Sequence, residues 1–476
     1  MLAFGAGCTV GPNYKRPDPV GPTPAAFKEQ QAPGGDWKAA QPGDATLRGK
    51  WWTLFDDPQL NALEEKVVVS NQTLKAAAAQ YQAARDQVRV ARAGYFPTVS
   101  LGPSATHTSE SNNQPGTIPG VTKYSFNTFI LPLQASWEPD LWGQVRRTVE
   151  QARANVDASA ADLANVALSL HSELALDYFS LRGLDTQKQL LESTLASDVD
   201  YLQLTQVRFR GGIATEVDVA QAETQVRSVK AQAIDLGVAR AQMEHAIALL
   251  IGVPPASFSL PPSSAPAALP VVPAGVPSAL LERRPDVAAA ERRVAAANAA
   301  IGIATAAYYP NVTLGAAGGL ESGFLGTLFQ VSSLFWSLGA SATETLFDAG
   351  RRHALTDQAR DQYEGQVATY RQSVLNAFRE VEDNLAALRV LSEESEAEAL
   401  AVEAARHSLA LSGQRYKGGV TTYLEVLTAQ TIQLANERTQ ADLLTRRYAA
   451  SVQLVKALGG GWGGREGVSP LASSPQ

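Results

Sequence analysis

Hydrophobic positions recur every seven residues in two long stretches of the chain that contain no proline. One stretch follows Pro139 and the other follows Pro310. Because a proline costs about 3 kcal/mol inside a helix, long helices are expected only in these stretches. The heptad positions are Val149, Val156, Leu163 and Leu170 in the first stretch, and Val367, Val374, Val381 and Leu388 in the second. The spacing predicts coiled-coil helices, one of them from about residue 144 to 209, and therefore an elongated body.

The second stretch repeats the first at an offset of 207 residues. After this shift, Ala160, Ala167, Leu174 and Leu181 coincide with the second heptad stripe. The same offset relates Arg208-Phe-Arg-Gly-Gly-Ile-Ala-Thr-Glu-Val-Asp218 to Arg415-Tyr-Lys-Gly-Gly-Val-Thr-Thr-Tyr-Leu-Glu425. Upstream, Tyr95-Phe-Pro-Thr-Val is similar to Tyr308-Tyr-Pro-Asn-Val. The sequence therefore predicts two internal repeats.

Each repeat is predicted to hold a helix, two strands, a long helix, a Gly-Gly turn and a further helix. In the first repeat the helix covers residues 71–93, and the strands cover 95 to about 106 and 124–137. In the second repeat the strands cover 311–320 and 331–347. Four strands are too few to close a barrel, and open strand edges are not tolerated in lipid, so membrane strands would need completion by other copies of the chain. Alternatively, the strands form two surface hairpins on a soluble coiled coil.

Composition and charge exclude several classes of protein. Hydrophobic residues make up 45% of the 476 residues and charged residues 18%, with a mean hydropathy of -0.11. These values are too apolar for a disordered chain and too polar for a helical membrane transporter. The formal charge is -7 and the acids and bases are interspersed, so no nucleic-acid partner is expected. Since the chain has no run of 18 apolar residues, any membrane crossing would be made by strands.

The chain has one cysteine, Cys8, which excludes an intramolecular disulfide and thiolate metal centres. Small residues precede Cys8 and a polar, turn-rich segment follows it, which resembles a bacterial lipobox. The prediction is that Cys8 carries a covalent diacylglycerol and an N-acyl lipid that anchor the chain to a membrane. The alternative is an unreactive cysteine. Residues 2–7 are too short for a complete secretory signal, so we expect a start codon further upstream or a trimmed sequence.

Four motifs, placed in order, carry a resemblance to a known family. They are the Cys8 to Pro17 segment, Trp51-Trp-Thr-Leu-Phe-Asp-Asp-Pro58, Glu282-Arg-Arg-Pro-Asp-Val-Ala-Ala-Ala-Glu291 and the two Gly-Gly segments. Over nearly its whole length the chain resembles the lipoprotein branch of the TolC-like outer-membrane efflux channels. This resemblance implies an α+β membrane fold. In it, a trimeric β-barrel with four strands per chain continues into a long coiled-coil α-helical barrel, and each chain has two internal repeats.

The resemblance also implies a function. The protein would be the outer-membrane channel of a tripartite efflux system, giving passive exit across the periplasm and the outer membrane. Its partners would be two further copies in a homotrimer, a periplasmic adaptor (membrane fusion protein), an inner-membrane RND-type pump and outer-membrane lipid. No catalytic activity, cofactor or metal is expected, and neither a nucleophile motif nor a metal-ligand spacing is present. The alternative is a periplasmic coiled-coil scaffold lipoprotein without a pore.

The expected divisions of the chain follow from the repeats and from its proline-rich and glycine-rich segments. They are 1–7, a remnant of a lipoprotein signal; 8–57, a lipid-anchored N-terminal segment; 58–255, the first repeat; 256–280, a Pro-rich linker; 281–460, the second repeat; and 461–476, a flexible C-terminal tail.

The Gly-Gly segments are the predicted tips, where each long helix reverses and where the adaptor would bind. They are Gly211, Gly212, Gly418 and Gly419, since glycine adopts the left-handed conformation that a reversal needs. The resemblance implies that Glu425, Asp218 and Tyr416 belong to an aperture at these tips, with Tyr416 able to meet Asp218.

A structural alternative explains both acids. Thr215 stands three residues before Asp218, and Thr422 three before Glu425, which is the capping-box spacing. Relatives often carry charged residues where this chain has Thr421, Thr428 and Thr431, so weaker closure of the tip is expected.

Overall fold

The computed structural model describes residues 9–19, 27–29, 49–109, 111, 125–263, 269–270 and 284–460. Cys8, the tail at 461–476 and most of the 256–280 linker lie outside these described residues. The chain divides into two compact units. Unit 1 comprises Met1–Pro17, Tyr81–Ser159 and Ala290–Tyr370, and unit 2 comprises Asp18–Gln80, Ala160–Ala289 and Arg371–Gln476.

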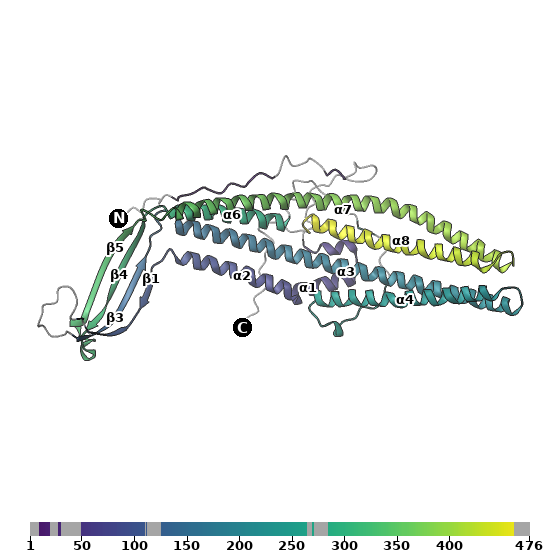
Figure 1. Ribbon diagram of the computed structural model, residues 1–476, viewed down its shortest axis with the longest axis horizontal. Helices are drawn as coiled ribbons and strands as arrows, with labels where there is room; N and C mark the ends of the chain where they lie inside the picture. Colours follow the sequence, from purple (N-terminus) through teal and green to yellow (C-terminus); the bar gives the residue numbers. More distant parts are fainter. Residues whose placement is uncertain are drawn as a thin grey trace. The chain divides into compact units, whose positions relative to one another are not determined.

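Helices make up most of the described chain (Figure 1). They are α1 (Pro58–Ser70), α2 (Gln72–Ala93), α3 (Gln144–Arg210), α4 (Glu216–Leu250), α6 (Pro285–Ala306), α7 (Arg351–Lys417) and α8 (Tyr423–Ala457). The helix predicted from residue 144 to 209 is confirmed as α3. With 67 residues each, α3 and α7 are roughly 100 Å long at 1.5 Å per residue. The helices that follow them, α4 and α8, have 35 residues each.

Polar caps set where several of these helices begin. Asp57 accepts hydrogen bonds from the backbone of Gln59 and Leu60, and Pro58 occupies the first position of α1. The side chain of Asn71 accepts from the Leu74 backbone, so α2 begins at Gln72. Ahead of α3, Asp140 accepts from the backbone of Val145 and Arg146. Each cap satisfies backbone donors that the first turn of a helix leaves unpaired.

The strands form one antiparallel sheet in unit 1, with the order β1-β3-β4-β5 and β2 also paired with β3. They are β1 (Thr98–Leu101), β2 (Ser104–Ser109), β3 (Ser125–Trp137), β4 (Asn311–Ser322) and β5 (Leu334–Thr343). The prediction of one strand from 95 to about 106 was wrong, because this strand begins at Thr98 and is interrupted at Gly102 and Pro103. These two residues lie opposite Leu131 and Pro132 of β3, and neither proline has an N–H for the ladder.

The last predicted strand is also shorter than expected. β5 begins at Leu334 instead of residue 331, because Val331–Ser333 form a short 3-10 turn, and it ends at Thr343 instead of residue 347.

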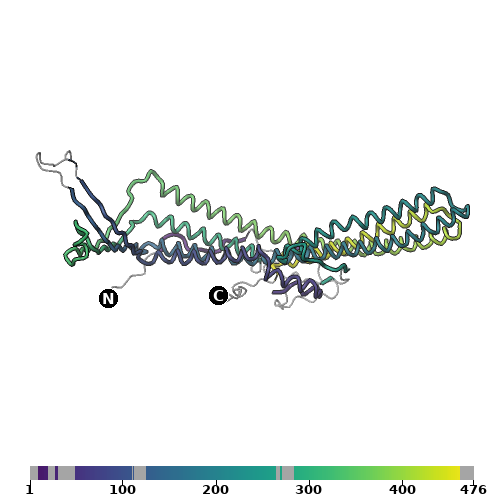
Figure 2. The backbone as a smooth tube through the Cα atoms, turned by 90° about the horizontal axis from the view of Figure 1, so that it is seen from below, coloured from purple at the N-terminus to yellow at the C-terminus, as the bar shows by residue number. Residues whose placement is uncertain are grey.

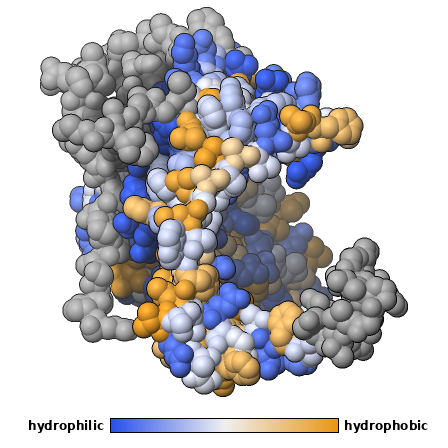
Figure 3. Space-filling model, turned by 90° about the vertical axis from the view of Figure 1, so that its left-hand side faces the viewer, coloured by the Kyte–Doolittle hydropathy of each residue, from blue (hydrophilic) through white to orange (hydrophobic). Residues whose placement is uncertain are grey.

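The register gives the sheet one apolar and one polar face, since directly opposed residues share a face. Rows such as Val99, Ala135, Ala316 and Leu338 run across the apolar face. This face also carries Leu101, Leu131, Leu133, Leu314, Leu320, Leu334 and Trp336. The polar face carries Thr98, Ser100, Thr106, Gln134, Ser136, Thr313, Glu321, Ser337 and Ser341. Exceptions include Phe126, Ile130 and Phe335 on the polar face and His107 and Asn127 on the apolar face. Seen from the end with the sheet, hydrophobic side chains reach the surface (Figure 3). Within the described residues, the outer edges of β5 and of β1 and β2 pair with no strand.

An extended N-terminal segment, residues 9–17, is bound to helices from both halves of the sequence within unit 1. The buried Arg147 of α3 donates to the carbonyls of Val10 and Gly11 and to the Asn13 side chain, at 3.0–3.2 Å. Asn298 of α6 donates to the Pro12 carbonyl at 3.0 Å. Arg16 donates to the Tyr370 hydroxyl of α7 at 3.3 Å. The segment is therefore part of the packed structure.

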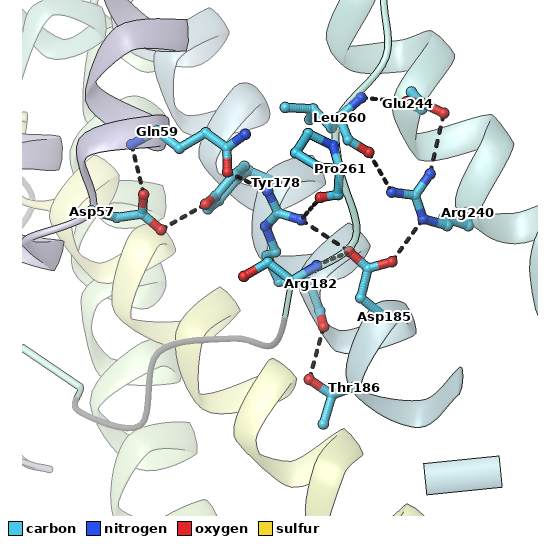
Figure 4. A network of polar contacts seen from close by, with 11 residues as sticks. Asp57, Gln59, Tyr178, Arg182, Asp185, Thr186, Arg240, Glu244, Leu260 and Pro261 are labelled. Carbon is cyan, nitrogen blue, oxygen red and sulfur yellow. Dashed lines mark hydrogen bonds and ion pairs between the residues drawn. The ribbon is translucent and has the colours of Figure 1, made fainter. Parts of the chain in front are cut away.

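Arg182 is the centre of a buried polar network in unit 2 (Figure 4). It is 1% exposed and donates to Asp185 and to the Pro261 carbonyl, each at 2.9 Å, and to Gln59. Arg240 of α4 donates to the other Asp185 oxygen at 2.7 Å. These bonds connect α1, α3, α4 and the segment after α4, so the network fixes how these elements pack.

Glu64 of α1 and His171 of α3 form a second buried polar contact in unit 2. The Glu64 Oε2 and the His171 Nδ1 are 2.6 Å apart, and Trp52 stacks on the imidazole with 4.4 Å between ring centroids. Burial raises the pKa of Glu64 to about 9 and lowers the pKa of His171 to about 4. Burial therefore favours the neutral form of both groups. His171 is thus a core histidine.

Candidate functional site

The turns between α3 and α4 and between α7 and α8 lie side by side at one end of unit 2 (Figure 2). At each turn the second glycine has a positive φ, 74° at Gly212 and 77° at Gly419. The Ile213 N–H donates to the Arg208 carbonyl at 2.8 Å, and the Val420 N–H donates to the Arg415 carbonyl at 3.0 Å. This hydrogen-bond pattern is the Schellman motif. The structure therefore places all four predicted glycines at the helix reversals.

One arginine connects the two helical hairpins. Arg208, in the last turn of α3, donates through Nη1 to the Tyr416 carbonyl at 2.7 Å and to the Lys417 carbonyl at 3.3 Å. Its guanidinium lies 4.7 Å from the centroid of the Tyr416 ring. A cation at the C-terminus of α7 is favourable because unpaired carbonyls concentrate negative charge there.

Tyrosines fill the space between the hairpins. Tyr416 and Tyr423 are buried and meet edge to face, with 5.8 Å between ring centroids, next to Ala222 and Val426. The Tyr416 hydroxyl is 2.8 Å from the Thr205 hydroxyl. The structure does not bring Tyr416 to Asp218 within the chain, because Thr205 is its hydrogen-bond partner.

The two candidate acids lie in different surroundings. Asp218 forms the predicted capping box with Thr215: its carboxylate accepts from the Thr215 N–H at 2.9 Å, and its own N–H donates to the Thr215 hydroxyl. The equivalent prediction for Glu425 was wrong, since Thr422 makes no side-chain cap. Glu425 instead accepts from Arg415 Nη1 at 2.7 Å and from the Thr421 hydroxyl. Arg415 outcompetes the cap because a charged donor binds a carboxylate more strongly than a backbone amide does.

The other two threonines of the second tip bond to their own helix. The Thr428 hydroxyl donates to the Leu424 carbonyl and the Thr431 hydroxyl to the Leu427 carbonyl, each at 2.9 Å. Both side chains contribute hydrogen bonds within α8, in keeping with the i−4 bonding that threonine makes in helices.

The sequence analysis did not predict a role at this site for three charged residues, Arg208, Arg415 and Asp198. The arginines stand at equivalent positions of the repeat, which was a usable signal. Asp198 had no such signal. It is fully buried on α3 and accepts from Gln430 of α8 at 2.8 Å, with Gln225 of α4 as a second hydrogen-bonding neighbour. Burial raises the pKa of Asp198 to about 6.

The pKa of Asp198 predicts that the tip packs more firmly in mild acid. Its pKa is raised from the ordinary value near 3.8, so the folded state binds the proton more tightly and loses stability as the pH rises through about 6. Opening of the α3–α4 hairpin, measured by hydrogen exchange corrected for intrinsic rates, should rise by up to about tenfold per pH unit between about pH 4 and 6. Asp198→Asn should remove this dependence. Asp200→Asn, at an exposed neighbour, should retain it, and equal profiles for all three proteins would refute the assignment.

Strands with one largely apolar face, in one chain with coiled-coil helices that end in packed tips, are the arrangement expected of the class of outer-membrane channels. Among the described residues, no helix is both long and apolar enough to cross a membrane. The model of the outer membrane efflux protein family matches residues 63–253 and 276–460, and the chain belongs to that family.

Relatives and solved structures agree with this assignment. The chain is 34% identical, over 97% of both chains, to the solvent efflux pump outer membrane protein SrpC of Pseudomonas putida. It is 32% identical to the pyoverdine export outer membrane protein OpmQ of Pseudomonas aeruginosa, over 93% of this chain and 94% of the relative. The outer-membrane channel OprN superposes with a TM-score of 0.86 at 33% identity, covering 96% of this chain and 100% of OprN. The open-state MtrE channel of Neisseria gonorrhoeae gives a TM-score of 0.81 at 28% identity, with 95% and 98% covered.

The protein is therefore an outer-membrane channel component of an efflux system. These matches favour the channel over a scaffold without a pore.

Proposed function

We propose that three copies of this chain close a twelve-stranded barrel and form the passive exit duct of a tripartite efflux system. In this count β1 and β2, which pair with successive parts of the same edge of β3, are one interrupted strand. The observation that carries the proposal is the sheet of unit 1, with its apolar face, its polar face and its two unpaired edges. Unpaired backbone groups are costly in lipid, so the edges must pair with equivalent edges of neighbouring copies. The apolar face then meets lipid and the polar face lines the pore.

The repeat organisation supports a matching helical barrel. α3 and α7 have equal lengths, α4 and α8 have equal lengths, and both turns use the same glycine motif. The family model also matches the chain in two segments. Three chains would thus give six similar hairpins around one axis, with the tips at the periplasmic end.

The partners and the cargo follow from the family. A periplasmic adaptor would bind the tips at Gly211, Gly212, Gly418 and Gly419, and an inner-membrane RND-type pump would deliver the substrate. Relatives are named for solvents, toluene and pyoverdine, so small organic molecules are the proposed cargo. A lipid on Cys8 would anchor each copy in the outer membrane.

The tips would form the aperture. A threefold ring of Glu425, with Asp218 and Tyr416 nearby, would favour cations and resist tight closure, as charge rings do in cation channels.

Single-channel recording in planar bilayers tests the function. The wild type is expected to form a mostly closed, cation-preferring pore, and Glu425→Gln is expected to lower the cation preference because it removes the ring charge. Glu223→Gln removes an exposed acid on α4 and should leave selectivity unchanged. A pore with identical selectivity in all three proteins would show that Glu425 has a structural role and does not set the selectivity. Absence of a pore, with a monomer on sizing, would support the scaffold.

A further inference from the structure

Arg208 and Arg415 occupy equivalent positions of the two repeats, but only one of them reaches the other hairpin. Arg208 binds the two carbonyls at the end of α7. The Arg415 side chain is 55% exposed, and its Nη1 donates to Glu425 of its own hairpin. One hairpin-to-hairpin contact is thus made within the chain, and its equivalent is not.

The receiving surfaces show the same difference. The ring covered by Arg208 belongs to Tyr416, which is 2% exposed, whereas the equivalent Phe209 is 44% exposed. Among the described residues, no arginine covers Phe209, and no side chain donates to the carbonyl of Phe209 or Arg210. The end of α3 therefore presents an aromatic ring and carbonyls that match those bound at the end of α7.

We propose that Arg415 of one copy binds the carbonyls of Phe209 and Arg210 in the next copy, with its guanidinium over Phe209. The inference rests on the proposed trimer. In a ring of three chains with two hairpins each, contacts alternate between those within a chain and those between chains. The contact made by Arg208 is the template for the one between copies.

The chemistry of the arginine permits this contact. A guanidinium has five N–H groups, and the bond from Nη1 to Glu425 leaves the others available. Arg210 brings positive charge close to Arg415, but Lys417 stands equally close to Arg208 in the contact that does form. Glu425 is then a positioning residue that aims Arg415 at its neighbour. Opening of the tip would require one such contact per copy to break.

Cross-linking of cysteine pairs tests the contact directly. In a Cys8→Ser background, Arg415→Cys with Arg210→Cys is treated with a short bismaleimide after trimer formation is confirmed by sizing. Covalent dimers and trimers are expected on a denaturing gel. The matched pair, Arg208→Cys with Lys417→Cys, should cross-link only within the chain. If the matched pair reacts and the first pair yields monomers alone from a trimer, the inference is overturned. If no trimer forms, the proposed function fails instead.

A functional measurement tests whether the contact between Arg415 and the next copy, here called the latch, holds the tip closed or only stabilises the fold. Arg415→Gln should raise the open fraction of the pore by about tenfold or more, because the variant loses charged hydrogen bonds at the closed tip. Arg415→Lys should restore closure in part, since it retains the charge without the fork. Arg227→Gln, at another exposed ion-paired arginine, should behave as wild type. An unchanged open fraction in Arg415→Gln would overturn the latch.

Discussion

Replacing Gly319 with alanine is expected to abolish assembly of the channel. Gly319 of β4 lies opposite Pro132 of β3. A Cβ at this position would lie 2.2 Å from the Leu131 carbonyl oxygen and 2.9 Å from the Pro132 Cα. Both atoms belong to the backbone of the neighbouring strand, so the clash can be relieved only by separating β3 from β4. The trimer that we expect for the wild type on a gel without boiling should be absent, along with pore activity in bilayers.

Gly315→Ala is the matched control for this change. Gly315 lies four residues earlier in the same strand and on the same face, but no heavy atom lies within 4 Å of its added Cβ. This variant should assemble like the wild type. Normal assembly of Gly319→Ala would show that β3 and β4 are not paired as described.

Replacing Arg182 with methionine is expected to destabilise unit 2 by about 3–5 kcal/mol, the usual cost of breaking a buried ion pair from one side. Methionine fills much of the volume but donates no hydrogen bond. Asp185, whose side chain is 2% exposed, would retain Arg240 and the Ser263 N–H but lose its bond to Arg182, and the Gln59 side chain and the Pro261 carbonyl would each lose a donor. Thermal unfolding followed by circular dichroism should show the loss.

Arg227→Met provides the comparison for Arg182. Arg227 pairs with Glu223 on the same helix, and both side chains are largely exposed, so the change should cost about 1 kcal/mol or less. Equal midpoints for the two variants would mean that the network around Arg182 contributes no more than a surface pair.

The parts of the fold that were predicted correctly follow from patterns within short distances along the chain. The heptads and the absence of proline predicted both ends of α3 to within one residue, and the glycine pairs predicted the positions of both turns. The break at Gly102 and Pro103 was missed although Pro103 stands inside the predicted strand. The second proline at the break, Pro132, is on the partner strand. At the second tip the spacing of Thr422 and Glu425 suggested a capping box. In the structure the Glu425 carboxylate is instead bound by Arg415 of the preceding helix. The pKa of Asp198 is raised by burial between packed helices, which no local pattern in the sequence indicates. A contact with another helix or strand decided each of these cases.

The N-terminal segment also affects when the chain can finish folding. Residues 9–17 are synthesised well before their partners Glu291, Asn298 and Tyr370, which follow 277, 286 and 354 residues later. Arg147 of α3 is available earlier, but the segment cannot complete its contacts until α6 and the first part of α7 have been made. Contacts of such large sequence separation form late and slowly. Closing these bonds is therefore a late step, which locks both halves of the sequence into unit 1 once each is in place.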